Sequence, residues 1–236
     1  MVKKIEKEYG DAASYLKNVN VPMASGTTVI RPTEDDPLLS PEDQKDYRSA
    51  VGMLLYLVKH SRPDLSNAVR ELSKVMSGAT NDHVKLLHQV IKFVLETKDR
   101  GILVKPNKHL GVTAYCDSDF AGDKGNRRSI TGFLIHLHDV RIAWKSKQQG
   151  AVTLSSSEAE YYAVSEVAME LKFLKMILDF LGVHSDELMK VYVANIGAIH
   201  LANNASTGTR TKHSDTRIHF VRELTQGEER LWKSNL

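Results

Sequence analysis

The hydrophobic periodicity of the chain changes at residue 101. Before it, apolar residues recur every three or four positions, as in Val51, Leu54 and Val58, which is the spacing of one face of an α-helix. After Gly101 they lie in short runs rich in β-branched and aromatic residues, separated by turn-forming segments, a pattern typical of β-strands. The sequence therefore predicts a helical region followed by a region that contains a sheet.

Three amphipathic helices are expected in the first hundred residues. Ser40-Pro41-Glu42-Asp43 offers a capping residue, a first-turn proline and first-turn acids, and so predicts the start of a helix of about 15 residues. Pro63-Asp64 begins the second, and the stripe from Val84 to Val94 marks the third. Residues 1–40 contain several glycines and prolines without sustained periodicity, which predicts a loose lead-in.

The second region predicts the element order βββαβα…α, and hence an α/β fold. Strands are expected at 111–117, 131–137 and 140–144, with a tight hairpin at His138-Asp139. A long helix over 157–181 follows and ends at Gly182. A fourth strand at 188–193 and helices at 196–202 and 215–224 complete the pattern. We expect domains at 41–105 and 106–236 after the lead-in.

Composition excludes several classes of protein. The longest apolar runs are too short to cross a bilayer, so we expect an intracellular protein that does not enter a membrane. The single cysteine, Cys116, excludes an internal disulfide and a cysteine-cluster zinc site. The net charge is only +3, but basic residues gather around 127–128, 141–147 and 210–222. Such gathering suits either a phosphate backbone or a solvated surface.

Two acidic residues are candidate site residues because of where they lie in the predicted strands and helices. Asp117 stands at the end of the first strand, where ligand chemistry often gathers in α/β sheets, although aspartate is also common in turns. Glu158 and Glu160 lie in the first turn of the long helix, about 200° apart. Glu160 precedes Val167 by seven residues and so shares the buried stripe, where a carboxylate needs a partner. Glu158 fits a helix N-terminus.

A third acid, Asp215, opens the last helix after His213. Ordinary helix capping explains an aspartate there equally well. If Asp117, Glu160 and Asp215 converge, a carboxylate cluster without cysteine ligands suits hard cations such as Mg²⁺ or Mn²⁺.

Several motifs resemble the ribonuclease H region of copia-type retrotransposon Pol polyproteins. They are Tyr115-Cys-Asp-Ser-Asp-Phe-Ala-Gly-Asp123, Arg128-Ser-Ile-Thr-Gly132, Trp144-Lys-Ser-Lys-Gln148, Leu154-Ser-Ser-Ser-Glu-Ala-Glu-Tyr161 and Arg210-Thr-Lys-His-Ser-Asp-Thr-Arg-Ile-His-Phe-Val-Arg-Glu223. Upstream, Tyr47-Arg-Ser-Ala-Val-Gly-Met-Leu-Leu-Tyr56, Arg62-Pro-Asp-Leu65 and Val90-Ile-Lys-Phe-Val-Leu-Glu-Thr-Lys-Asp99 resemble the thumb or connection segment of the reverse transcriptase. No Tyr-x-Asp-Asp polymerase motif is present, so we expect a fragment or a degenerate copy without the polymerase palm.

The resemblance implies a ribonuclease H-like α/β fold: a mixed five-stranded sheet flanked by helices and preceded by a small helical segment. It implies a metal-dependent endonuclease that hydrolyses the RNA strand of RNA/DNA hybrids, with two Mg²⁺ or Mn²⁺ ions. The implied partners are the hybrid and the reverse transcriptase palm and fingers of the parent polyprotein. The implied location is cytoplasmic, in the virus-like particle of the element, with the nucleus as the alternative.

The resemblance also implies roles for individual residues. Asp117, Glu160 and Asp215 correspond to the first, second and fourth acids of the family and to its metal ligands, and His213 to a catalytic helper. The third acid should precede Asn195, but Ala194 stands there, so cleavage is expected to be impaired. Nucleic-acid contacts are expected from basic and polar residues near these motifs, namely Arg128, Ser129, Lys145, Lys147, Ser156, Asn195, Arg210 and Lys212.

Two other functions remain as alternatives. The chain could be an inactive hybrid-binding or structural module with the same fold. An integrase-type strand transferase is disfavoured, because its glutamate comes last among the acids, whereas Glu160 is second here.

Overall fold

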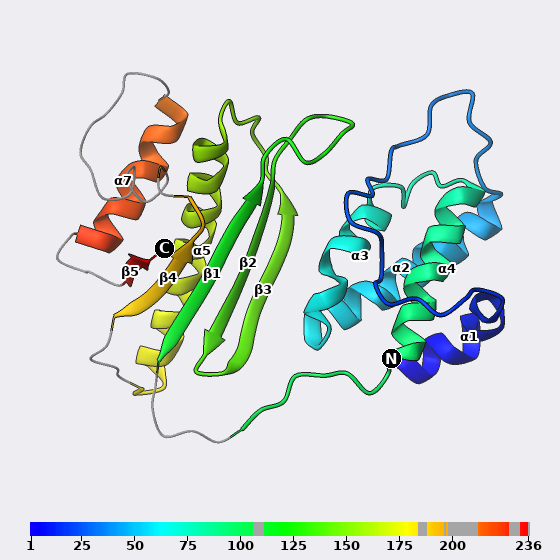
Figure 1. The fold of residues 1–236 in the computed structure, drawn as a ribbon, viewed down its shortest axis with the longest axis horizontal. Helices are drawn as coiled ribbons and strands as arrows, with labels where there is room; N and C mark the ends of the chain where they lie inside the picture. The colour runs from blue at the N-terminus through cyan, green and yellow to red at the C-terminus, as the bar shows by residue number, and fades with distance from the viewer. Residues whose placement is uncertain (106–110, 184–187, 196, 198–211, 227–231, 236) are drawn as a thin grey trace. The chain divides into compact units, whose positions relative to one another are not determined.

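The computed structural model describes residues 1–105, 111–183, 188–195, 197, 212–226 and 232–235, and in the last two ranges only the side chains of 217 and 219–225. The chain divides into two compact units, Met1–Ile102 and Leu103–Leu236 (Figure 1). Each is described by itself below.

Unit 1 is helical. Its elements are α1 (Val2–Ser14), α2 (Pro41–His60), the 3₁₀-helix η1 (Pro63–Leu65), α3 (Ser66–Ser73) and α4 (Asn81–Glu96). Helix α2 begins where the sequence predicted: Pro41 is its first residue, and the Ser40 hydroxyl accepts a hydrogen bond from the Asp43 amide at 3.1 Å. Such a cap satisfies one of the amides that the first helical turn leaves unpaired.

The loose lead-in expected over residues 1–40 is wrong for its first part, which forms α1. Val2, Ile5, Tyr9 and Ala13 recur at three- and four-residue spacing, and Ile5 and Ala13 are buried in the core of unit 1, where α1 packs against α4. Charged residues fill the positions between them, so the apolar face is narrow. Docking of that face against α4, rather than local propensity, explains the helix.

We expect Ile5→Ala to destabilise unit 1 by about 2–4 kcal/mol, because it removes a fully buried aliphatic side chain. Urea unfolding followed by far-ultraviolet circular dichroism measures the change. Lys7→Ala, on the exposed side of the same helix, is the matched control and should leave the midpoint nearly unchanged. Equal effects of the two substitutions would contradict a docked α1.

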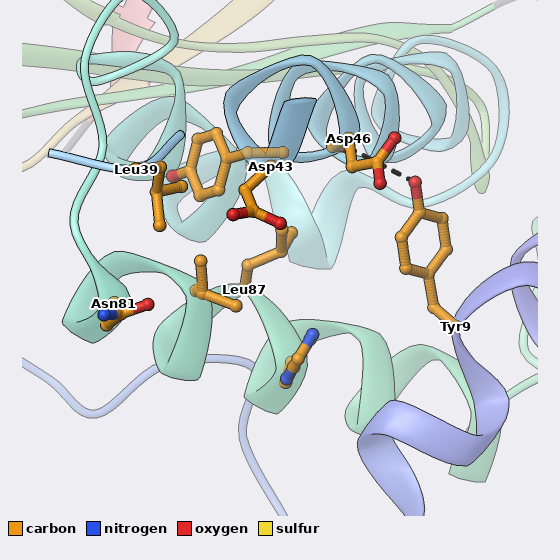
Figure 2. A pocket seen from close by; sticks show the side chains of 9 residues that line it. Tyr9, Leu39, Asp43, Asp46, Asn81 and Leu87 are labelled. Carbon is orange, nitrogen blue, oxygen red and sulfur yellow. Dashed lines mark hydrogen bonds between the residues drawn. The ribbon is translucent and has the colours of Figure 1, made fainter. Parts of the chain in front are cut away.

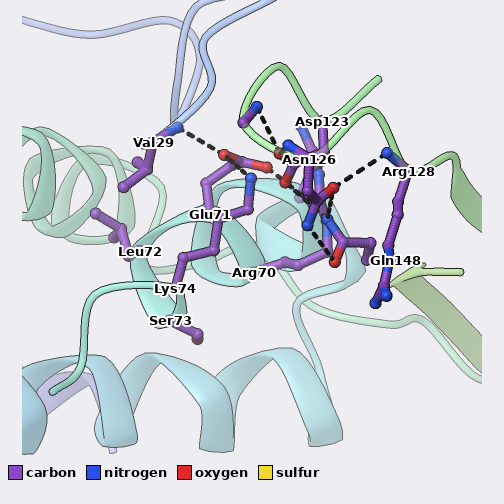
Figure 3. Close-up of polar contacts among 12 residues, drawn as sticks. Val29, Arg70, Glu71, Leu72, Ser73, Lys74, Asp123, Asn126, Arg128 and Gln148 are labelled. Carbon is purple, nitrogen blue, oxygen red and sulfur yellow. Dashed lines mark hydrogen bonds and ion pairs between the residues drawn. The ribbon is translucent and has the colours of Figure 1, made fainter. Parts of the chain in front are cut away.

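Two buried ion pairs shape unit 1. Arg62 is almost fully buried and donates to both carboxylate oxygens of Asp64 and to the carbonyl and hydroxyl of Thr97. Glu71 accepts from Lys74 Nζ at 2.8 Å and from the Val29 amide at 2.7 Å (Figure 3). Because every one of these charges has partners, their burial is tolerated. The Arg-Pro-Asp-Leu motif therefore has a structural role here.

Unit 2 is an α/β domain built on a five-stranded sheet. Its elements are β1 (Val112–Asp119), β2 (Ile130–Leu137), β3 (Val140–Gln148), α5 (Ser156–Phe180), β4 (Met189–Val193), α7 (Lys212–Gln226) and β5 (Trp232–Asn235). The strand order is β3-β2-β1-β4-β5, with β1, β2 and β3 antiparallel and β1, β4 and β5 parallel. The sheet is thus mixed, as expected.

Helix α5 lies along one face of the sheet, against β1 and β2, and α7 packs beside it (Figure 1). The core between helix and sheet contains Ala114, Ile135, Val167 and Leu171. The hairpin at His138-Asp139 is confirmed, with His138 at a φ of 56°. The strand pattern did not predict β5, and most of the helix expected at 196–202 lies outside the described residues.

The register between β1 and β4 matters most for the site. Their parallel ladder ends with the pair Cys116–Val193. Asp117 and Ala194 are therefore the next residues on two neighbouring strands, which are about 4.8 Å apart in a regular sheet. Strand β1 itself continues to Asp119 through its pairing with β2, two residues beyond the expected end.

Candidate active site

Helix α5 places Glu160 near the C-terminal end of β1, the central strand of the sheet. The Ser155 hydroxyl caps the helix by accepting from the Glu158 amide at 3.1 Å, while the Glu158 carboxylate accepts from the Leu154 amide at 2.8 Å. This reciprocal cap fixes the first turn. Glu160 then points toward the sheet with only 6% of its surface exposed. The helical-phase prediction that Glu160, and not Glu158, faces the sheet is confirmed.

The Glu160 carboxylate is poorly satisfied. Its Oε1 accepts from the Ser118 amide at 3.3 Å, whereas Oε2 is buried without a hydrogen-bond partner among the described residues. Burial, followed by the negative charge of Asp117, raises the pKa of Glu160 to about 7. A buried carboxylate beside a second acid is a common arrangement at functional sites, because it suits a cation or a transferable proton.

Asp117 lies close enough to Glu160 for its charge to act on that carboxylate, yet it is itself exposed. Its neighbour Cys116 points the other way, into the core. Burial, with smaller contributions from Glu160 and Asp117, raises the pKa of the Cys116 thiol to about 12. The structure thus brings together two of the predicted acids, one buried and one open to solvent.

Ala194 directly follows the last residue of β4, as Asp117 follows Cys116 on β1, and it is exposed. The resemblance places the third acid there. An alanine side chain supplies neither charge nor oxygen, so this corner of the site lacks a ligand group.

Asp215 and His213 lie in the first turn of α7, but their side chains lie outside the described residues. What positions α7 is described: the Arg217 guanidinium donates to Ser165 Oγ at 2.8 Å and lies 4.4 Å from the ring centroid of Tyr162, both on α5. Sequence patterns did not predict this role of Arg217. Its place two residues after Asp215, on a helix with a cationic start, was the available indication.

Asp123 is a structural residue. It is buried, and its carboxylate accepts from the Gly125 amide at 2.9 Å and from Gln148 Nε2 at 2.7 Å, while Asn126 Oδ1 accepts from the Arg128 amide at 3.0 Å (Figure 3). These bonds order the loop between β1 and β2. That loop lies at the same edge of the sheet as Asp117, because Ile130 pairs with Asp119.

Two of the predicted nucleic-acid contacts, Ser129 and Lys145, have partners within the protein. Ser129 is buried, and its hydroxyl is bonded to the Ala121 amide and to Thr153, so a nucleic acid does not reach it in this structure. The Lys145 ammonium is held by Glu166 at 3.2 Å and Glu170 at 3.4 Å. A phosphate contact by Lys145 would therefore have to compete with these two carboxylates, and it stays a prediction.

The other predicted contacts are compatible with an exposed surface. Lys147 and Ser156 are exposed, and Arg128 and Asn195 are partly so. Arg210 lies outside the described residues, as does the side chain of Lys212.

A cavity of about 300 Å³ lies in unit 1, far along the chain from the predicted acids. Its lining joins apolar side chains to acidic and polar ones from α1, α2 and α4 (Figure 2). Tyr9 donates to the Asp46 carbonyl at its rim, at 3.2 Å. None of the sequence motifs that we singled out for chemistry contributes to it.

Within the described residues, no group of three or more His, Cys, Asp or Glu side chains could hold a metal ion, and the side chain of the third predicted ligand, Asp215, is not among them. The pair Asp117 and Glu160 fits a hard divalent cation: both supply carboxylate oxygens, and the buried Oε2 of Glu160 has no bond to give up. Ala194 does not fit. None of the described helices is long and apolar enough to cross a membrane.

Fold and site together define an α/β protein with a mixed five-stranded sheet and a carboxylate pair at the edge of its central strand. No protein-family model matches the chain. It is 38% identical over 184 residues, 78% of its length, to the retrovirus-related Pol polyprotein from transposon RE2 of Arabidopsis thaliana. It is 35% identical over 218 residues, 89% of its length, to that from transposon RE1. The chain belongs to the copia-type retrotransposon Pol polyproteins.

The chain spans only a small part of those relatives, 13% and 14% of their lengths. Among solved structures, LC11-RNase H1, isolated from compost by a metagenomic approach, is similar to it at 16% identity and a TM-score of 0.40, covering 54% of this chain and 84% of that one. A TM-score at this level does not by itself establish a shared fold.

Proposed function

We propose that unit 2 is a ribonuclease H-type endonuclease domain that acts on the RNA strand of RNA/DNA hybrids, with turnover impaired by Ala194. The observation that carries the proposal is the Glu160 carboxylate, buried beside Asp117 with one oxygen unbonded. A side chain in that state is costly to keep unless it binds something. Membership of the Pol polyprotein family supports the substrate class.

In this proposal, Asp117 and Glu160 hold the cation, and Asp215 joins them from α7. A bound divalent cation supplies charge stabilisation at the scissile phosphate and lowers the pKa of a water molecule. The Ser118 amide fixes the orientation of Glu160, and Arg217 holds α7 against α5. In this proposal, the exposed Lys147 and Ser156 and the partly exposed Arg128 contact phosphates or sugar hydroxyls of the hybrid, which is read by shape rather than by sequence.

The proposal predicts binding with weak cleavage. The chain should bind an RNA/DNA hybrid more tightly than a DNA duplex of the same sequence, as measured by fluorescence anisotropy. Slow cleavage of the RNA strand is expected in Mn²⁺, and Asp117→Asn should abolish it while the hybrid affinity without metal stays the same. Equal affinity for both duplexes, or cleavage that persists in Asp117→Asn, would exclude the proposed site.

Ala194 favours a second candidate, an inactive hybrid-binding or structural module of the same polyprotein. The two candidates predict different outcomes for cleavage of the RNA strand. Hybrid affinity without any cleavage, in Mn²⁺ and after a carboxylate is returned to position 194, would establish the second candidate.

A further inference from the structure

Helix α5 exposes a continuous apolar stripe along its second half. Leu171 faces the sheet, and Phe173 lies about 200° further around the helix, on the opposite side. From there the exposed apolar side chains recur at three- and four-residue spacing. They are Met169, Phe173, Met176, Ile177 and Phe180, and Phe180 is 88% exposed.

A stripe of this kind is unusual on a surface that stays in water. Single exposed apolar residues are common, but contiguous patches usually mark a contact site. Two phenylalanines and two methionines are also the side chains that pack well against varied partners. The remaining question is which partner has the matching shape and charge.

The stripe is complementary to itself. If two α5 helices pair antiparallel about a two-fold axis that passes between residues 174 and 175, Met169 lies opposite Phe180 and Phe173 opposite Met176. Each aromatic ring then meets a thioether, a favourable contact, and the arrangement satisfies the rule that a two-fold interface uses the same patch twice.

The flanking charges agree with this pairing. Lys172 and Asp179 are seven residues apart, so they lie on the same flank of the stripe, within about 20° of each other. The same two-fold axis brings Lys172 of one copy to within about two residues of Asp179 of the other, about 3 Å along the helix axis, at both ends of the contact. Asp179 also pairs with Lys175 in its own helix, which orients its carboxylate.

We propose that the exposed stripe of α5 binds a second copy of this chain, giving an antiparallel two-fold dimer. This inference does not rest on the proposed nuclease function. The stripe covers about three helical turns, which bury less than the roughly 800 Å² per partner of a standard interface, so the dimer is expected to dissociate at micromolar concentrations.

Sedimentation equilibrium of the full chain between about 1 and 200 µM tests the proposal. The expected result is a reversible monomer–dimer equilibrium, weakened at least about tenfold by Phe173→Glu and again by Phe180→Glu. Leu103→Glu, at an exposed apolar residue outside the stripe, is the matched control and should leave the equilibrium unchanged. A monomer throughout, or a dimer that survives both phenylalanine substitutions, overturns the proposal.

Charge reversal tests the antiparallel register. Lys172→Glu and Asp179→Lys should each weaken the dimer severalfold, and the double variant should recover most of the loss, because the exchanged charges again meet across the axis. Both sites are on the surface, so the fold of the monomer, followed by circular dichroism, stays intact in all three variants. Additive losses without recovery would exclude this register.

Discussion

Ala194→Asp is expected to raise the rate of RNA-strand cleavage at least about hundredfold in Mg²⁺, since losing a direct metal ligand should cost more than the 10- to 100-fold typical of an outer-shell partner. The reason is positional. The β1–β4 ladder ends at Cys116–Val193, so residue 194, just past the end of β4, is the next residue beside Asp117. A carboxylate there adds a third negative charge next to Asp117 and Glu160, where a divalent cation gains most.

Ala194→Asn is the matched control for this gain. Asparagine has nearly the volume of aspartate and can donate and accept hydrogen bonds, but it carries no charge. We expect little or no increase in cleavage for it. Single-turnover cleavage of a labelled hybrid measures both variants. Equal rates for wild type, Ala194→Asp and Ala194→Asn would show that position 194 is not the third ligand position.

Glu160→Gln is expected to stabilise unit 2 at pH 8 by on the order of 2 kcal/mol while leaving its stability near pH 4 unchanged. Burial and the charge of Asp117 raise the pKa of Glu160 from its ordinary 4.5 to about 7. Below pH 4.5 the acid is protonated in the folded and unfolded states alike. Between pH 4.5 and 7 only the folded state keeps the proton, so stability falls as pH rises, and above pH 7 the full cost of the buried charge remains. Glutamine mimics the protonated acid and removes that cost.

Urea unfolding at several pH values, followed by tryptophan fluorescence, measures the effect, because both tryptophans of the chain belong to unit 2. Glu158→Gln in the same helical turn, where the carboxylate accepts from the Leu154 amide, is the control and should not stabilise unit 2 at pH 8. Millimolar Mg²⁺ at pH 8 should reduce the difference in unfolding free energy between Glu160→Gln and the wild type, because it stabilises the wild type alone. If this difference in unfolding free energy is the same at every pH, the charged form of Glu160 is not destabilised by burial.

Much of unit 2 follows from local patterns. The strands and α5 alternate or repeat with clear periods, and capping residues such as Ser155 and the turn at His138 and Asp139 fix their ends. β5 lacks that information, because Trp232–Asn235 is too short to show alternation and is specified by pairing with β4. In unit 1, α1 was not predicted for a related reason. Its narrow apolar face stabilises a helix only when it packs against α4.

In the site, too, some features follow from local sequence patterns and others depend on tertiary structure. Helical phase was enough to choose Glu160 over Glu158, since it depends on one element alone. The proximity of Asp117 to Glu160 and to Ala194 depends on sheet register, which the resemblance implied but local patterns did not contain. The internal partners of Ser129 and Lys145 were not predicted, because a sequence does not show that a hydroxyl is buried against Thr153 or that an ammonium pairs with Glu166 and Glu170.

Cys116, the one thiol of the chain, lies in the middle of the sheet next to these acids, with 5% of its surface exposed and its pKa raised to about 12. A thiolate is the reactive form of cysteine, and here both burial and the neighbouring carboxylates suppress it. Alkylating reagents at neutral pH should therefore reach it only when β1 separates from α5. The rate at which the Cys116 thiol is alkylated therefore reports how often the sheet opens next to Asp117 and Glu160. This measurement can be made on the wild-type chain.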